Sequence, residues 1–162
     1  MIELEPILKT LTENQVDFVI IGGVAITAHG SAYVTQDLDI AFLRTRENTA
    51  RISKALLPFH PRPREFPVDL PFVFDDSTLL NGTSFTFSTD VGDLDLLGEV
   101  AGVGTFADVL ASSVPMKLLD KEVQVLSIDG LIAAKRAAGR TKDLLVLPEL
   151  EALREALGEN EE

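Results

Sequence analysis

Residues 19–42, VIIGGVAITAHGSAYVTQDLDIAF, contain the two motifs that decide the fold. An apolar run rich in β-branched residues ends at Gly22 and Gly23, a pattern typical of a buried strand that turns into a helix. Later in the stretch, Asp37 and Asp39 alternate with apolar residues, as they would on a strand with one face in the core. Glycines at a strand-to-helix turn followed by an Asp-x-Asp strand are what a site for phosphate and magnesium requires.

Asp37 and Asp39 are predicted to point to the same side of their strand, because side chains at i and i+2 share a face. Two ionised carboxylates on one face repel each other, and a divalent cation between them removes that repulsion. Oxygen ligands in a chain without cysteine favour Mg²⁺ or Mn²⁺ over zinc. Gly22 and Gly23 lack a Cβ, so their backbone amides can approach phosphate oxygens closely.

Each of these motifs also has an interpretation without function. A Gly-Gly pair after a strand is, taken alone, a common tight turn, and an Asp-x-Asp is most often a solvated strand face. The two motifs at this spacing, each associated with a predicted strand, are far more specific and favour a functional site.

Composition limits the classes of protein that remain. The chain has 162 residues, 46% of them hydrophobic, enough for one domain with a sizeable core, and residues 158–162 are expected to be a flexible tail. Its 14 basic and 26 acidic residues give a net charge of −12, which disfavours extended binding to DNA but not a small nucleotide beside a cation. Without a signal peptide or an apolar run of about 20 residues, we expect a cytoplasmic protein with no membrane span.

Hydrophobic periodicity predicts an α/β domain with a mixed central sheet flanked by helices. Predicted helices cover residues 3–14, 24–29, 46–57, 106–112, 131–138 and 142–157. Predicted strands cover residues 17–21, 36–43, 83–88, 92–97 and 123–126, and the third and fourth of them form a hairpin.

Residues 58–67, PFHPRPREFP, contain four prolines and are predicted to form no regular structure. Arg62 and Arg64 make this loop locally basic. The loop is therefore either a lid over a substrate or an ordinary solvated loop.

The two motifs resemble the signature of the nucleotidyltransferase superfamily, whose fold is that of DNA polymerase β. That signature is an apolar residue with Gly-Gly or Gly-Ser, a spacer, and then Asp-apolar-Asp/Glu-apolar; here it is matched by IGG at 21–23 and DLDI at 37–40. A nearer likeness is to small stand-alone bacterial nucleotidyltransferases, including the AbiEii-type toxins of abortive-infection toxin–antitoxin pairs. Their stretch AHG-x-x-R-x-T-x-DLDI is similar to AHGSAYVTQDLDI here, with Thr35 in place and Tyr33 where those relatives often have arginine.

The resemblance implies one more carboxylate from a later strand, where the family pattern reads apolar-Asp-Leu-Leu. Residues 92–100, GDLDLLGEV, supply Asp95 as the better match and Asp93, on the same face, as the alternative. An exposed hairpin with solvated acids is the other interpretation, but the leucines between these acids favour a buried strand.

A second resemblance concerns the basic stretch IAAKRAAGRTKD at 132–143. Many of these small enzymes have Lys-Arg-x-x-x-Arg-x-Lys-Asp here, and the resemblance makes Lys135 and Lys142 the candidate ligands of the nucleotide phosphates, where a cation offsets developing charge. Alternatively, these cations only complement the dipole of a helix that ends near Gly139. The sequence favours neither interpretation over the other.

The resemblance as a whole implies a metal-dependent nucleotidyltransferase that moves a nucleoside monophosphate from a nucleoside triphosphate to an acceptor hydroxyl. The acceptor, whether a protein, an RNA end or a small molecule, is open, as is an antitoxin partner. Alternatives are a catalytically weakened nucleotide-binding or interaction module, which Tyr33 favours, and an enzyme of the aminoglycoside-modifying type, for whose helical substrate domain the chain leaves little room. The candidate residues are Asp37, Asp39 and Asp95 for catalysis and metal binding, and Gly22, Gly23, Thr35, Lys135 and Lys142 for the nucleotide.

Overall fold

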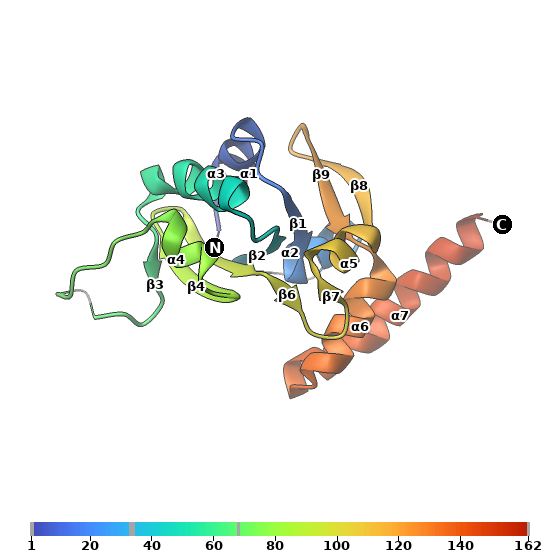
Figure 1. The fold of residues 1–162 in the computed structure, drawn as a ribbon. Helices are drawn as coiled ribbons and strands as arrows, with labels where there is room; N and C mark the ends of the chain where they lie inside the picture. The colour runs from blue at the N-terminus through green and yellow to red at the C-terminus, as the bar shows by residue number, and fades with distance from the viewer. Residues whose placement is uncertain (1, 33–34, 68, 162) are drawn as a thin grey trace.

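A mixed β-sheet forms the centre of the molecule in the computed structural model, which describes residues 2–32, 35–67 and 69–161 (Figure 1). Within these ranges seven strands have the order β3-β4-β5-β2-β1-β9-β8. Their bounds are Arg62–Pro63 for β3, Ser84–Thr89 for β4, Gly92–Leu97 for β5, Asp37–Phe42 for β2, Phe18–Ile21 for β1, Lys121–Leu126 for β9 and Ser113–Leu118 for β8.

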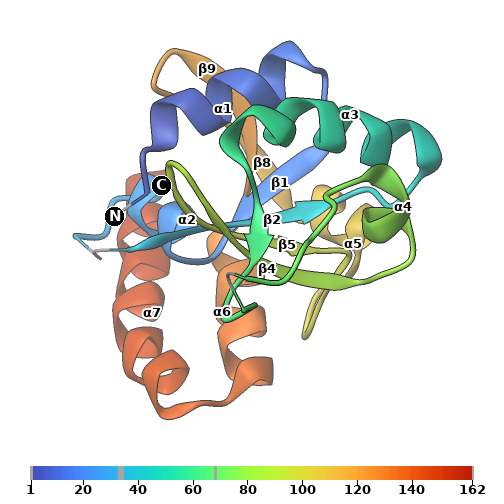
Figure 2. The same ribbon diagram turned by 90° about the vertical axis from the view of Figure 1, so that its left-hand side faces the viewer.

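Helices cover both sides of this sheet. Figures 1 and 2 show α1 (Leu4–Glu13) and α3 (Arg46–Leu56) on one side, with α6 (Ile128–Ala138) and α7 (Thr141–Glu161) on the other. The short α2 (Gly22–Ala28) follows β1 directly and contacts α6. The remaining elements are the 3₁₀ turn η1 (Leu57–Phe59), α4 (Asp76–Leu80), the pair β6 (Glu99–Val100) and β7 (Gly104–Thr105), and α5 (Phe106–Ala111).

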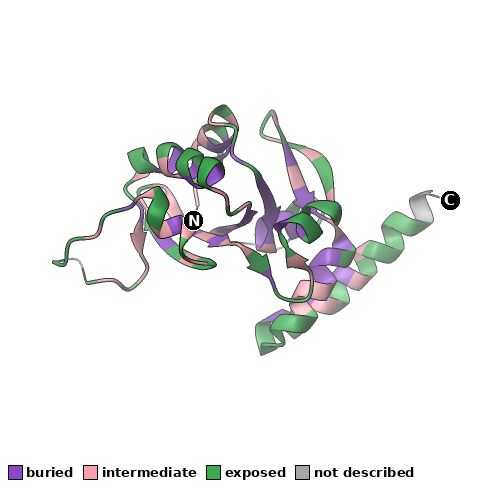
Figure 3. Cartoon of the chain, viewed as in Figure 1, coloured by how far each residue is buried: buried purple, intermediate pink, exposed green. Residues whose placement is uncertain are grey.

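The core lies on the apolar faces of the central strands (Figure 3). All four residues of β1 are buried, while β2 and β5 alternate between buried leucine or isoleucine and half-buried aspartate. This alternation is the two-residue period of a strand with one face in the core, as the sequence predicted. The fully buried members on β2 and β5 are Leu38, Ile40, Leu94 and Leu96.

The pairing of the central strands gathers the acidic residues at one place. Strands β2 and β5 are parallel, so Asp37 lies beside Asp93 and Asp39 beside Asp95. Strand β1 is antiparallel to β2 and brings Ile21, the last residue before the glycine turn, beside Asp39. Two segments more than fifty residues apart in the chain thus present their carboxylates next to one glycine turn.

The predicted α/β class with a mixed sheet is confirmed, and the predicted helices and strands all occur with small shifts of their ends. The prediction of no regular structure over residues 58–67 is wrong. The segment contains η1 and β3, and Arg64 extends the strand pairing by donating its backbone N–H to Thr86 O at 2.8 Å. Short edge strands of this kind tolerate Pro63, since one side of the strand needs no partner.

Strand β8, helix α4 and the β6–β7 pair were not predicted. Strand β8 contains Pro115 and lies at the edge of the sheet, where proline is accepted. Helix α4 is held by its N-cap, because Asp75 accepts a hydrogen bond from the backbone N–H of Thr78. Within the described ranges, the helices are all too short or too polar to cross a membrane.

Candidate functional site

The glycine turn between β1 and α2 supports a carboxylate. Gly22 has φ +66°, a conformation that favours glycine, and a Cβ added to it would lie 2.1 Å from Oδ2 of Asp39. Helix α2 begins at this residue, and Gly23 is buried in its first turn. The absence of a side chain at Gly22 therefore gives Asp39 its place, a use of this glycine that the sequence analysis did not predict.

A polar cleft of about 400 Å³ lies beside this turn. The candidate residues named from the sequence line it, except Gly22, which lines the apolar pocket next to it, and Asp93, the alternative third carboxylate. The candidates that the cleft brings together are Gly23, Thr35, Asp37, Asp39, Asp95, Lys135 and Lys142.

The carboxylates in this cleft repel one another electrostatically. The pKa of Asp39 is raised to about 7, first by burial, then by a hydrogen bond with Asp95 and by the negative charges of Asp95 and Asp37. The positive charge of Lys135 lowers this pKa, but by less than the other effects raise it. Two carboxylates can share a hydrogen bond only when one of them holds a proton, so this part of the cleft has more negative charge than its neighbours balance.

The carboxylates are close to one another but are not arranged as a finished metal site. In the part of the chain that the structure describes, no three histidine, aspartate or glutamate side chains are placed to hold one metal ion together. Asp39 and Asp95 are in contact, and the negative charge of Asp37 helps to raise the pKa of Asp39.

The contacts of Arg64 distinguish the two candidates for the third carboxylate. Its Nη2 donates to Oδ1 of Asp95 at 2.7 Å, while its Nε lies 3.5 Å from Oδ2 of Asp93. Asp95 lines the cleft, whereas the side chain of Asp93 is 41% exposed and is turned toward Arg64. The structure thus places Asp95, not Asp93, beside Asp39.

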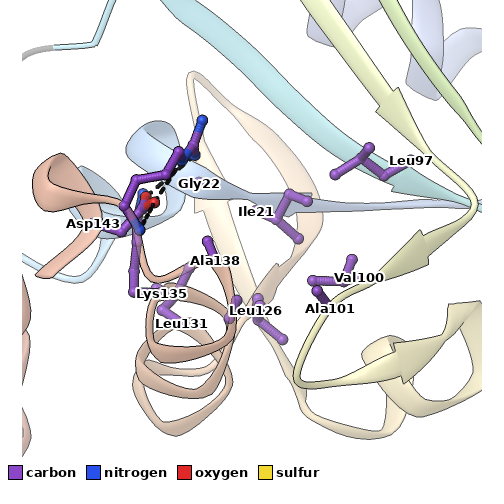
Figure 4. Close-up of a pocket in the computed structure, with 12 residues that line it drawn as sticks. Ile21, Gly22, Leu97, Val100, Ala101, Leu126, Leu131, Lys135, Ala138 and Asp143 are labelled. Atoms are coloured by element: carbon purple, nitrogen blue, oxygen red, sulfur yellow. Dashed lines mark hydrogen bonds and ion pairs between the residues drawn. The ribbon is translucent and has the colours of Figure 1, made fainter.

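On the opposite flank, Asp143 holds two cations at the edge of the cleft (Figure 4). Its side chain is fully buried and accepts hydrogen bonds from Nε of Arg140 at 2.6 Å and Nζ of Lys135 at 3.2 Å. The pKa of Asp143 falls to about 2, first because of the hydrogen bond from Arg140 and then, against the opposing effect of burial, because of Lys135. The cations thus have a defined position, which complementing the α6 dipole alone would not require.

Sequence reasoning matched Arg140 and Asp143 to the basic motif but named only Lys135 and Lys142 as phosphate ligands, and it gave Asp143 no part in positioning Arg140. Of the other cations in this stretch, Lys142 lines the cleft, and Arg136 is paired outside it with Glu151 at 2.7 Å. The signal that could have found Asp143 is its place in the first turn after Gly139, where a carboxylate can face back toward the preceding helix.

An apolar pocket of about 190 Å³ adjoins the cleft (Figure 4). It lies between α6 and the ends of β1, β5, β6 and β9, and its apolar lining includes Leu97, Val100, Leu126, Leu131 and Ala134. Ile21, Leu97, Lys135 and Arg140 line both spaces, so the pocket and the cleft adjoin at these residues, two of which are cations. Its residues come from distant parts of the chain, and no local sequence pattern indicates it.

Thr35 fixes the start of β2. Its hydroxyl donates to the carbonyl oxygen of Asp37 at 2.9 Å and accepts a weaker hydrogen bond from the Asp37 N–H at 3.3 Å. Tyr33, which stands where the related nucleotidyltransferases often have arginine, lies outside the described residues.

Comparison with solved structures identifies the fold. A Thermotoga maritima protein assigned as a nucleotidyltransferase has TM-score 0.55 and 16% identity, covering 98% of this chain and 96% of its own. The lincosamide antibiotic adenylyltransferase LnuA, bound to lincomycin, has TM-score 0.62 and 14% identity over 93% of this chain and 96% of its own. ANT(2″)-Ia in complex with adenylyl-2″-tobramycin has TM-score 0.59 and 16% identity over 98% and 97%.

The chain therefore has the nucleotidyltransferase fold that the motifs predicted. No protein-family profile and no curated protein sequence matches it. At these identities the shared property is the fold, so the activity depends on what this chain's own residues can do.

Proposed function

We propose that this protein is a metal-dependent nucleotidyltransferase that transfers a nucleoside monophosphate from a nucleoside triphosphate to an acceptor hydroxyl and releases pyrophosphate. The observation that carries the proposal is a single cleft with carboxylates on one flank and cations on the other. Asp37, Asp39 and Asp95 form the acidic flank, and Lys135, Arg140 and Lys142 form the basic flank. Carboxylates are the ligands that divalent cations prefer, and lysine and arginine offset the charge of phosphate groups, so the cleft suits a metal–nucleotide complex.

The acidic flank suits Mg²⁺ or Mn²⁺. Its donors are carboxylate oxygens only, and the pKa of Asp39 is raised first by burial and then by Asp95 and Asp37, effects that a bound cation would oppose. Asp37, Asp39 and Asp95 would hold the metal. When bound, such ions activate an attacking oxygen and neutralise the leaving pyrophosphate.

The chain's own residues supply the remaining steps. Lys135, Arg140 and Lys142 bind the triphosphate and oppose the charge that collects on the leaving pyrophosphate. Because Asp143 holds Lys135 and Arg140 in place, these donors need little reorganisation when the substrate arrives. Asp95 lies on the flank away from these cations and accepts the proton of the acceptor hydroxyl.

The adjoining apolar pocket receives the nucleoside. It opens beside Lys135 and Arg140, so a ligand whose phosphates lie against these cations directs its base into the pocket. Of the charged side chains that line the pocket, Lys135 and Arg140 also line the cleft, and Asp143 holds these two cations in place. The rest of the lining is apolar, which favours recognition by shape with weak selection between bases.

The acceptor is the finer part of the proposal. Two neighbours in fold are antibiotic adenylyltransferases, one bound to lincomycin and one to an adenylylated tobramycin, which supports a small molecule. The likeness of residues 28–40 to AbiEii-type toxins supports a protein or an RNA end, with an antitoxin as partner. A catalytically weakened nucleotide-binding module is the second candidate function, supported by carboxylates that, among the described residues, are not yet arranged around an ion.

The decisive experiment measures pyrophosphate release from Mg²⁺ complexes of the four nucleoside triphosphates, with RNA, protein and small-molecule acceptors. Asp37→Ala should abolish release while circular dichroism and melting temperature stay close to those of the parent protein. Asp129→Ala is the matched control, since this aspartate is 76% exposed on α6 and outside the cleft. Unchanged release in Asp37→Ala contradicts the proposed mechanism, and nucleotide binding without any release by the parent protein supports the module.

A further inference from the structure

Arg64 brings a cation to the carboxylates from the β3–β4 end of the sheet, whereas Lys135 and Arg140 come from α6 and from the turn between α6 and α7. Its side chain is 29% exposed, and its guanidinium contacts Asp95, the carboxylate that also contacts Asp39. The reaction proposed above gives Arg64 no part.

The position of Arg64 is fixed by the sheet. Its backbone N–H donates to Thr86 O at 2.8 Å, and its Nη2 also donates to Phe87 O at 3.3 Å. The neighbouring Arg62 has a different role, because its Nη2 donates to the carbonyl oxygens of Pro67 and Leu70 and so closes the loop on itself. Arg64 therefore lies at Asp95 because of backbone pairing and not through a chance contact of a long loop.

The guanidinium is only partly satisfied in this position. Among the described residues, its Nε is the one buried side-chain nitrogen or oxygen without a hydrogen-bond partner, at 3.5 Å from Asp93 Oδ2. A buried donor without a partner costs about 1–3 kcal/mol. A purely structural ion pair would not be expected to keep this cost, whereas a group that changes partners has to satisfy two arrangements.

A metal ion and Arg64 compete for the same charge. Both are cations that need Asp95, and cations brought together at one carboxylate repel each other strongly where little water screens them. Occupancy by one must therefore weaken binding of the other.

We propose that Arg64 is a built-in counter-ion: it neutralises Asp95 while the cleft is free of metal and lowers the affinity of the cleft for a metal ion without nucleotide. Phosphate oxygens of a nucleotide add ligands and negative charge, so metal and nucleotide together displace Arg64 where the metal alone does not. Arg64 thus sets the order of loading, with the metal entering as its nucleotide complex. This inference rests on the proposed function, because it takes Asp95 as a metal ligand.

The test is the binding of Mn²⁺ to the whole protein at constant ionic strength, followed by electron paramagnetic resonance, first without nucleotide and then with a non-hydrolysable nucleoside triphosphate. Arg64→Met removes the charge and keeps an unbranched apolar side chain. We expect it to tighten Mn²⁺ binding without nucleotide by at least about tenfold (~1.4 kcal/mol) and to reduce the gain that nucleotide adds. Arg62→Met is the matched control and should leave both values unchanged, because the Arg62 guanidinium contacts backbone carbonyls and the ring of Phe66 within its own loop.

Equal or weaker Mn²⁺ binding by Arg64→Met overturns the counter-ion role while leaving the proposed function intact. Absence of Mn²⁺ binding in every variant, even with nucleotide, overturns the metal site and with it both proposals. If Arg64→Met does not fold, Arg64→Gln replaces it, because glutamine is also neutral and can still donate to Phe87 O. Its Mn²⁺ affinity is measured in the same way, and the same two outcomes overturn the counter-ion role or the metal site.

Discussion

Asp39 is half-buried in the cleft and Asp143 is fully buried beside the adjoining pocket, and their pKa values move in opposite directions. Asp143 accepts hydrogen bonds from Arg140 and Lys135, and its pKa falls to about 2. The pKa of Asp39 rises to about 7, first because of burial and then because of the neighbouring Asp95 and Asp37. The difference teaches that cations of the chain balance the charge of Asp143, whereas Asp39 is surrounded mainly by other carboxylates.

The two aspartates therefore make stability depend on pH in opposite ways. A depressed pKa in the folded state gives Asp143 a stabilising effect that is present above its unfolded pKa near 4 and is lost as pH falls toward 2. A raised pKa makes Asp39 destabilising: the metal-free protein loses stability as pH rises from about 4 through 7, because the folded state then has to release a proton it holds more tightly.

Among the variants that test this comparison, Asp143→Asn should have the largest effect on the free energy of unfolding. The substitution leaves Lys135 and Arg140 without their shared carboxylate, and we expect a loss of about 2–3 kcal/mol in the free energy of unfolding at pH 7. Urea denaturation measures it. The control is Glu151→Gln, which breaks the exposed pair with Arg136 and should cost less than about 1 kcal/mol. Equal losses in the two variants would mean that burial adds nothing to the Asp143 cluster.

A smaller effect of opposite sign is expected from Asp39→Asn in the absence of metal. Removing a carboxylate whose charge is opposed first by burial and then by Asp95 and Asp37 should stabilise the fold by about 2 kcal/mol at pH 8, and by little at pH 4, where Asp39 already holds its proton. Melting curves across this pH range in the presence of a chelator provide the measurement. Asp69→Asn, at an exposed position of the loop, is the control and should show no such dependence. A gain that is the same at both pH values would refute the assignment to Asp39 ionisation.

The smallest predicted effect is on ligand binding, and it distinguishes a role of the pocket from a role of the basic flank. Ala138→Leu adds an exposed side chain at the pocket and should weaken binding of a nucleoside triphosphate about tenfold (~1.4 kcal/mol), while binding of inorganic triphosphate stays unchanged. Calorimetry with both ligands and Mg²⁺ makes the comparison. Ala156→Leu places the same change at an exposed site about 20 Å further along α7 than Asp143 and should alter neither. Parallel losses for both ligands would argue against a nucleoside in this pocket.

Local patterns were enough to predict the centre of the fold. Alternating aspartate and apolar residues indicated β2 and β5, and the glycine pair indicated the turn between β1 and α2. The edge elements escaped prediction because β3 is two residues long and β8 contains Pro115, so neither has a clear period.

The same limit applies to the site. Asp37, Asp39 and Asp95 could be named because each lies in a recognisable strand motif. The pairing of Arg64 with Asp95 joins residues 31 apart and depends on the register of β3 with β4, which no local pattern encodes. The fully buried state of Asp143 likewise depends on how α7 packs against α6, a tertiary contact.

The close approach of Gly22 to Asp39 has a consequence for engineering this scaffold. Any side chain at position 22 would occupy the space of the Asp39 carboxylate, so a variant there reports a displaced acid and not a lost phosphate contact. Alanine scanning cannot separate the two residues, and a library that varies this turn has to change positions 22 and 39 jointly or leave both untouched.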